Sequence, residues 1–266
     1  MLKAIFQSSI IGIFILLLGC GSTTKLHKKK ENNSCWQKIE SAAIDAIQNP
    51  NVWVPLVSTA VTQIGDVNKN ISSTGWEDTP VFGSQKNARN FSNYFLYASV
   101  ATYVTITLFT QGSNDSVFWS DFKKQNILTG VLSFPSTISL TELLKETVHR
   151  QRPDNSDYLS FPSGHTSTVA VSNILTQKNI RHLMHSNDLF NFLQYIPTGL
   201  TLATAWARIE AKRHYLSDTF AGMALGNFWG LFFSKLLNTE EKNLSFQVNK
   251  SYEYNTFLIN LCYQFD

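Results

Sequence analysis

The sequence is poor in charge and in cysteine. Charged residues make up 15% of its 266 residues, with 22 Lys and Arg and 19 Asp and Glu. A scattered net charge of +3 lacks the dense basic surface typical of nucleic-acid binding. The three cysteines and six histidines form no cluster with zinc-binding spacing. We therefore expect no nucleic-acid partner, no metal site and no cofactor.

Hydrophobic residues, in contrast, make up 43% of the chain and aromatic residues 13%. This proportion is enough for a large buried core and is not typical of a disordered chain. A mean hydropathy of -0.10 argues against a bundle of lipid-embedded helices. The length favours one domain, or one domain with an appendage.

The N-terminus has the order of a secretory signal: Lys3, an apolar run from Ile10 to Leu18, then Gly19 and Cys20. The run is shorter than the about 20 residues that span a bilayer. Leu17 to Cys20 also resemble the lipobox of bacterial lipoproteins, in which the cysteine is acylated. We expect a signal peptide at 1–19 and a lipidated Cys20 on a polar tether at 20–35. The alternative is an uncleaved anchor helix.

This interpretation places the protein in the bacterial cell envelope, lipid-anchored and facing the periplasm, with the outer membrane favoured over the inner. An integral membrane protein is the alternative. Cys35 and Cys262 would then be the cysteines left to pair, and they form either a disulfide or two separate buried thiols.

Apolar periodicity predicts a mainly helical domain over residues 36–240. The uncharged segment from Tyr94 to Thr110 could enter a membrane, but we favour a buried helix of a bundle. Residues 65–90, rich in polar residues and glycine, predict a surface loop. Residues 241–266 alternate apolar and polar side chains and predict a β-hairpin that docks on the helices. The expected helices begin near Trp36 and continue at about 52–64, 91–111, 131–152, 164–178, 195–208 and 214–238.

Two clusters of polar residues point to an anion site. Lys145 and Arg152 are two helical turns apart, so both cations would project from one helix face, and Pro153 would end that helix. Pro162 is followed by Ser163, Gly164 and His165 and then by an apolar helical run. Ser163 can cap this helix, and Gly164 lets the backbone N–H groups approach an anion closely.

A third cluster contains Arg208, His214 and Asp218. His214 and Asp218 are four residues apart, so we expect them to be adjacent on one helix face. The carboxylate would then accept the imidazole N–H and leave the other ring nitrogen nucleophilic. Taken singly, each of these clusters could also be an ordinary charged surface.

In this order, the three clusters resemble the signature motifs of the phosphatidic acid phosphatase type 2 superfamily. That superfamily includes bacterial acid phosphatases and vanadium haloperoxidases. The resemblance implies a helical bundle with the active site at the helix ends. Ala207 departs from the pattern, because the family usually has Ser before its Arg. The missing hydroxyl implies a less organised site and not an inactive one.

The resemblance implies a phosphate monoester hydrolase that needs no metal. His214 would attack phosphorus, Asp218 would orient its ring, and His165 would protonate the leaving oxygen. The phosphoryl oxygens would be held by the cationic side chains and by the start of the helix after the second motif, with Lys145, Arg152, Ser163, Gly164 and Arg208 as the binding set.

The leaving group stays open: a soluble phosphate ester, a lipid phosphate and an isoprenyl diphosphate all fit. The oligomeric state stays open too. The alternatives in function are a vanadium-dependent haloperoxidase and a non-catalytic phosphate- or lipid-binding lipoprotein. The remaining histidines have no partner at a usable spacing and are predicted to lie at the surface, namely His27, His149, His182 and His185.

Overall fold

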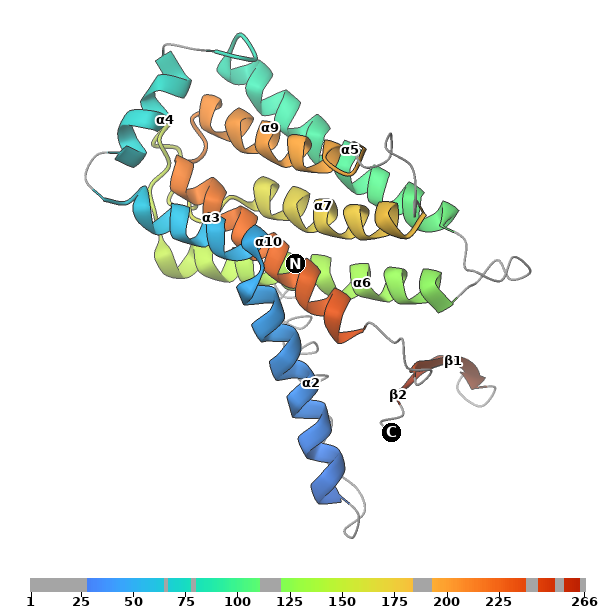
Figure 1. Cartoon of the computed structure of the whole chain (residues 1–266). Helices are drawn as coiled ribbons and strands as arrows, with labels where there is room; N and C mark the ends of the chain where they lie inside the picture. Colours follow the sequence, from blue (N-terminus) through green and yellow to red (C-terminus); the bar gives the residue numbers. More distant parts are fainter. Residues whose placement is uncertain are drawn as a thin grey trace. The chain divides into compact units, whose positions relative to one another are not determined.

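A computed structural model of the chain describes residues 28–64, 67–77, 80–110, 121–183, 193–237, 244–251 and 256–263. Its described part is mainly helical, as predicted, and contains eight helices (Figure 1). Their bounds are α2 (Lys28–Gln48), α3 (Pro50–Val61), α4 (Val67–Glu77), α5 (Gln85–Phe109), α6 (Asp121–Val148), α7 (Gly164–Leu183), α9 (Ile196–Glu210) and α10 (Leu216–Leu236).

The chain divides into two compact units. Ala42–Leu237 form the helical unit, and residues 1–41 and 238–266 form the other. In the latter, strands β1 (Leu244–Ser251) and β2 (Thr256–Tyr263) pair antiparallel, with Leu244 opposite Tyr263. The docking of this hairpin on the helices, and the domain boundaries, stay predictions.

Several of the sequence-based predictions concern the chain termini. Residues 1–27, with Cys20, lie outside the described residues, and so do the side chains of Cys35 and Cys262. The signal peptide, the lipidation and the disulfide therefore stay predictions. Helix α2 begins at Lys28, so the second half of the predicted polar tether is helical.

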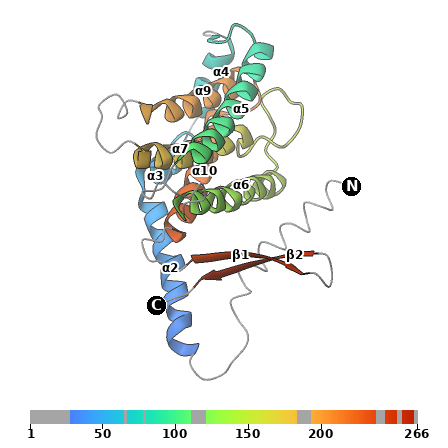
Figure 2. The same cartoon turned by 90° about the vertical axis from the view of Figure 1, so that its right-hand side faces the viewer.

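Helix α7 is the central helix of the helical unit. It packs against α5, α6, α9 and α10 (Figures 1 and 2). Its side chains are buried almost without interruption from Thr166 to Gln177. Helix α7 begins at Gly164, directly after Pro162 and Ser163 of the second motif. The residue before it, Ser163, is consequently held by the best-packed part of the molecule.

Helices α7 and α10 approach each other closely because α10 carries small residues at the contact. A Cβ atom on Gly222 would lie 2.6 Å from the carbonyl oxygen of Ser163, and a Cβ on Gly226 would meet the backbone of Ser167 and Val171. Any larger side chain would push the helices apart. The two glycines therefore fix the distance between the second and third motifs.

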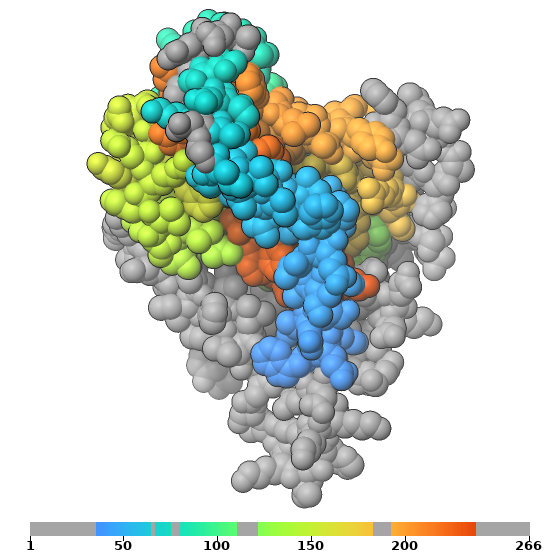
Figure 3. All heavy atoms as spheres, turned by 60° about the vertical axis from the view of Figure 1, so that its left-hand side comes forward, coloured from blue at the N-terminus to red at the C-terminus, as the bar shows by residue number. Residues whose placement is uncertain are grey.

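The stretch predicted as a surface loop at 65–90 instead contains a helix, α4. This correction has a physical reason in the tertiary packing of α4 against α9 and α10. Ser72 Oγ accepts from Leu216 N at 3.1 Å, and Asn68 Oδ1 accepts from Ser217 N at 3.0 Å. The polar residues that suggested a loop thus pair with the free N–H groups at the start of α10. Figure 3 shows α3 and α4 on the face of the molecule where α3 covers α10.

A buried carboxylate forms hydrogen bonds with the backbone of the connection from α4 to α5. Glu210, the last residue of α9, is 1% exposed, and its oxygens accept from the backbone N–H groups of Val81 and Phe82 at 2.9 Å. These bonds tie the start of α5 to the end of α9, two residues after Arg208.

The expectation of a buried helix over Tyr94–Thr110 is only partly met. Helix α5 buries a narrow and largely polar stripe that includes Ser92, Ser99 and Thr107, and it leaves Tyr94 and Phe109 exposed. Within the described residues, the segment long and apolar enough to cross a membrane lies instead in α6, at Phe122–Val148.

Candidate active site

The three sequence clusters meet at one end of the helical unit, where the loop between α6 and α7 contacts the turn between α9 and α10. Two backbone bonds and one side-chain bond join the loop to this turn and to the start of α10: Asp154 N donates to Lys212 O, Ser163 N donates to Asp218 O, and Arg152 Nη1 donates to Arg213 O. Residues far apart in sequence are thereby brought into one site.

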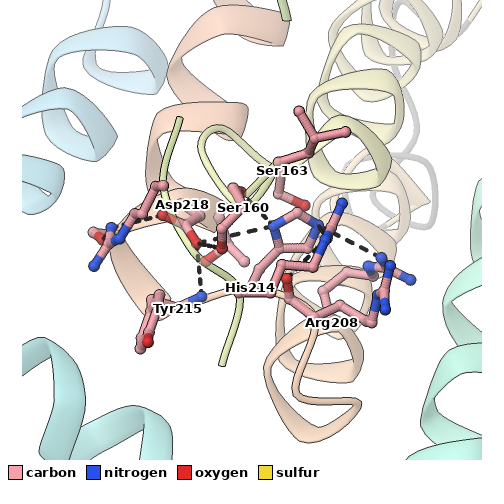
Figure 4. Close-up of polar contacts among 12 residues, drawn as sticks. Ser160, Ser163, Arg208, His214, Tyr215 and Asp218 are labelled. Carbon is pink, nitrogen blue, oxygen red and sulfur yellow. Dashed lines mark hydrogen bonds and ion pairs between the residues drawn. The ribbon is translucent and has the colours of Figure 1, made fainter. Parts of the chain in front are cut away.

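His214 lies at the centre of the site and is 2% exposed (Figure 4). Its Nδ1 lies 2.6 Å from the carbonyl oxygen of Ser160, an acceptor that fixes the proton on Nδ1. Its Nε2 lies 3.3 Å from Arg152 Nη1 and 3.5 Å from Arg208 Nη2. The unprotonated Nε2 therefore points to two guanidinium groups, where an anion would bind.

The predicted hydrogen bond between His214 and Asp218 is wrong. His214 Nδ1 lies 3.9 Å from Asp218 Oδ2, beyond hydrogen-bond distance. The reason is that His214 lies before helix α10, whose N-cap residue is Tyr215. Asp218 instead accepts from Tyr215 N at 2.8 Å and caps its own helix. The two residues do not share a helix face.

Asp218 is fully buried but has several donors. Ser160 Oγ donates to its Oδ2 at 2.6 Å, and Arg150 Nη1 donates to its Oδ1 at 2.7 Å. Burial raises the pKa of Asp218 to about 6, although Arg150 and Ser160 act in the opposite direction. The carboxylate thus becomes ionised only towards neutral pH.

Arg208 has the properties of an anion-binding group. It is 6% exposed, and Nη1 donates to Ser92 Oγ of α5 at 3.3 Å. Its buried Nε has no hydrogen-bond partner among the described residues. Burial and the nearby Arg152 lower the pKa of Arg208 to about 9, which still leaves it charged at neutral pH. A bound phosphate would satisfy both the charge and the unpaired N–H.

Arg152 does not lie on a helix with Lys145 as predicted, because α6 ends at Val148, and His149 adopts a positive φ of 52°. Arg152 therefore belongs to the loop that follows. It is oriented by Asp157, whose Oδ1 accepts from Nε at 2.6 Å, and by Arg213 O. The loop, and not helical periodicity, directs Arg152 to His214.

Lys145 reaches the site by a different route. A Cβ atom on Gly164 would lie 3.2 Å from Lys145 Nζ, so the absence of a side chain at this glycine makes room for the ammonium group. Glu142 pairs with Lys145 at 2.7 Å from the more exposed side. Ser163 Oγ accepts from Thr166 N at 3.5 Å, consistent with the predicted cap, and lies 3.0 Å from the Thr166 hydroxyl.

His165 stands at the first turn of α7, and its Nε2 lies 2.7 Å from Asn93 Oδ1 of α5. Burial lowers the pKa of His165 to about 3, and Arg208 and Lys145 act in the same direction. The pKa of His214 is also far below its usual value, because of burial and the adjacent Arg208 and Arg152. Both rings are neutral in the free protein at neutral pH.

Sequence reasoning missed five residues that contact this constellation. Ser160 and Asp157 lie in the loop between two motifs, and Arg150 lies inside the first motif. Their closeness in sequence to the motifs could have identified them as candidates. Ser92 and Asn93 are on α5 and precede the first motif by more than 50 residues. Nothing in the local sequence links α5 to the site. Two of the predicted surface histidines stack on aromatic rings, His149 on Tyr158 and His182 on Phe122.

Among the residues that the structure describes, no group of three or more His, Cys, Asp or Glu side chains is arranged to hold a metal ion. The charged side chains nearest to His214 Nε2 and to His165 are instead cations. Ala207, the departure from the family pattern, is fully buried beside Arg208. Ser92 supplies Arg208 with a hydroxyl partner from another helix.

Residues 126–242 match the model of the PAP2 superfamily. The match includes every predicted catalytic and phosphate-binding residue and ends before β1. It supports a phosphatase. A solved structure, the transmembrane PAP2-type phosphatidylglycerolphosphate phosphatase from Bacillus subtilis, is similar at 20% identity and a TM-score of 0.48, over 76% of this chain and 92% of that one. None of the curated proteins matches the sequence significantly.

Proposed function

We propose that the protein is a phosphate monoester hydrolase that acts on phosphorylated lipids through a phosphohistidine on His214. One observation carries this proposal: the unprotonated Nε2 of a buried histidine faces Arg152 and Arg208 at 3.3 and 3.5 Å. A neutral nucleophile next to two fixed cations is suited to attack a phosphoryl group.

In the first step His214 Nε2 attacks phosphorus in line, forming an N–P bond as the bond to the leaving oxygen breaks. Arg152, Arg208 and Lys145 hold the phosphoryl oxygens together with the backbone at Ser163 and Gly164. The proton remains on Nδ1, which donates it in a hydrogen bond to the Ser160 carbonyl, and Asp218 offsets the positive charge that develops on the ring.

His165 protonates the leaving oxygen and later takes a proton from the water that hydrolyses the N–P bond. Its Nε2–H is occupied by Asn93, so Nδ1 is the atom that exchanges the proton. The free-protein pKa of about 3 means that the ring is unprotonated at neutral pH before substrate binds. A bound phosphate dianion screens Arg208 and Lys145, which raises the pKa of His165 and lets it act as an acid.

We propose a membrane location. The apolar helical segment Phe122–Val148 fits it, and the lipid anchor at Cys20 would provide it independently. A Cys20→Ser variant with a cleavable soluble signal peptide distinguishes a lipid anchor from a membrane-spanning helix. An anchored enzyme is released as active soluble protein, whereas an integral one stays in the membrane pellet and needs detergent.

Phosphate release tests the activity. Purified protein is assayed with a phosphorylated lipid in mixed micelles and with a soluble monoester, both with excess chelator. We expect metal-independent turnover, higher kcat/KM for the lipid, and inhibition by orthovanadate, which resembles the five-coordinate transition state. Activity lost on chelation and restored by a divalent metal contradicts the mechanism. Halide oxidation by vanadate-loaded protein, without phosphate release, favours the haloperoxidase.

A further inference from the structure

The carboxylate of the third motif reaches the nucleophile indirectly, through one residue outside the three motifs. Ser160 is fully buried and makes two contacts in opposite directions. Its hydroxyl donates to Asp218 Oδ2 at 2.6 Å, and its backbone carbonyl accepts the Nδ1–H of His214 at 2.6 Å. Ser160 N also donates to Arg150 O at 3.0 Å. Ser160 therefore links Asp218 to the imidazole of His214 (Figure 4).

The far side of the carboxylate is held by Arg150. Its Nη1 donates to Asp218 Oδ1 at 2.7 Å and to Ser217 Oγ at 2.8 Å. The guanidinium lies 4.3 Å from the ring centroid of Tyr215, a cation–π contact that limits its movement. Arg150 thus contacts neither His214 nor the anion pocket, in contrast to Arg152 two residues later.

Resting on the proposed function, we propose that Arg150 and Ser160 are positioning residues: Arg150 keeps Asp218 ionised, and Ser160 transmits its position and charge to His214. The geometry separates two sets of arginines by task. Arg152 and Arg208 face Nε2 and the phosphate, whereas Arg150 acts on the opposite side of the ring.

The contribution of Arg150 can be distinguished from that of Ser160, because only Arg150 carries a charge. The groups that face Asp218 are Arg150 from the loop after α6, Ser160 from the loop before α7, and His214 beyond Ser160. Helix α4 faces this end of α10 with the uncharged Asn68 and Ser72. Removing the guanidinium removes the one cation paired with this carboxylate within the described residues. The pKa of Asp218 then rises further, and the active ionised form appears only at higher pH.

The test is the pH profile of kcat/KM for Arg150→Met, Arg150→Lys and wild type. We expect Arg150→Met to shift the acid limb upward by about one pH unit or more, and Arg150→Lys to restore part of the shift. Inhibition by inorganic phosphate should change little, since Arg152 and Arg208 remain. Ser217→Ala removes the other Arg150 contact and should leave the limb in place.

Ser160→Ala removes the hydroxyl but keeps the carbonyl. We expect kcat to fall about tenfold or more with little change in KM. The matched control is Ser172→Ala, which removes an equally buried hydroxyl that donates to Ser99 O at 2.7 Å, far along α7. If Ser160→Ala does not fold, Ser160→Thr, which keeps the hydroxyl, should retain the wild-type acid limb.

Equal effects of Ser160→Ala and Ser172→Ala, or an unmoved acid limb in Arg150→Met, overturn the positioning role. These outcomes are separable from failure of the proposed function. If wild-type protein forms no phosphoenzyme, the nucleophile assignment fails. If it forms one and the variants behave as wild type, the positioning role alone fails.

Discussion

The family-matched segment and the helices before it contribute differently to one site. Residues 126–242 supply the groups that would contact phosphate, whereas α4 and α5 supply partners for those groups. Ser92 and Asn93 hold Arg208 and His165, and Asn68 and Ser72 pair with the start of α10. The chemistry is thus concentrated in one segment, and its orientation depends on another. Substitutions in the two regions should differ in size and in kind.

The largest effect is expected inside the matched segment. His214→Ala should lower kcat by at least about 1,000-fold, because no neighbouring group can replace the nucleophile. Steady-state phosphate release measures this. His182→Ala, which loses a ring contact with Phe122 instead, is the control and should remain active. A His214→Ala variant with more than a few per cent of wild-type activity would assign the wrong nucleophile.

Arg208→Met should follow, with a loss of about 100-fold or more in kcat/KM and weaker inhibition by inorganic phosphate. The substitution removes a buried cation. Its Nε has no hydrogen-bond partner among the described residues and could therefore donate to a phosphoryl oxygen. Arg181→Met removes an exposed arginine that contacts Gln194 and should change neither quantity. Unchanged phosphate inhibition in Arg208→Met would remove Arg208 from the anion site.

In the region before the match, Asn93→Ala should lower kcat about tenfold, a typical cost of one lost orienting hydrogen bond to a catalytic group. Since Asn93 holds His165 and not the phosphate, KM should change much less. Asn90→Ala, an exposed change on the same helix, is the matched control. An equal fall in both variants would mean that α5 matters only for folding.

The smallest effect on turnover is expected for Ser72→Ala. It leaves Leu216 N unpaired at the start of α10 and should lower the free energy of unfolding by about 1 kcal/mol, with kcat within a few-fold of wild type. Denaturant unfolding compares it with Ser73→Ala, whose hydroxyl contacts only Asn70 O of its own helix among the described contacts. A large loss of kcat at unchanged stability would give α4 a catalytic role.

The activity itself should depend on pH through Asp218 and His165. Asp218 must be ionised to offset charge on His214, so kcat/KM should rise as pH increases through about 6. With substrate bound, the phosphate raises the pKa of His165, so kcat should fall again at the higher pH at which His165 in the complex loses the proton for the leaving group. A rate that keeps rising to strongly alkaline pH would contradict these roles.

The helical class and the motif residues could be predicted from the sequence, because they depend on the spacing of charged and small residues along the chain. Prediction from the sequence failed where contacts are made across the fold. The polar composition of 67–77 favoured a loop, but α10 provides N–H groups that pair with Asn68 and Ser72. Helical spacing paired His214 with Asp218, whereas the N-cap at Tyr215 separates them. Neither could be found without the tertiary structure.

The most direct measurement is a rapid-quench experiment with substrate labelled on phosphorus. Wild-type protein should accumulate label bound to the protein before steady state, stable in alkali and labile in acid, as expected for an N–P bond. Mapping should place the label on His214, and the His214→Ala variant should retain none. Label bound to another residue, or product release without any labelled protein under conditions in which the step after bond cleavage is slow, would contradict nucleophilic attack by His214.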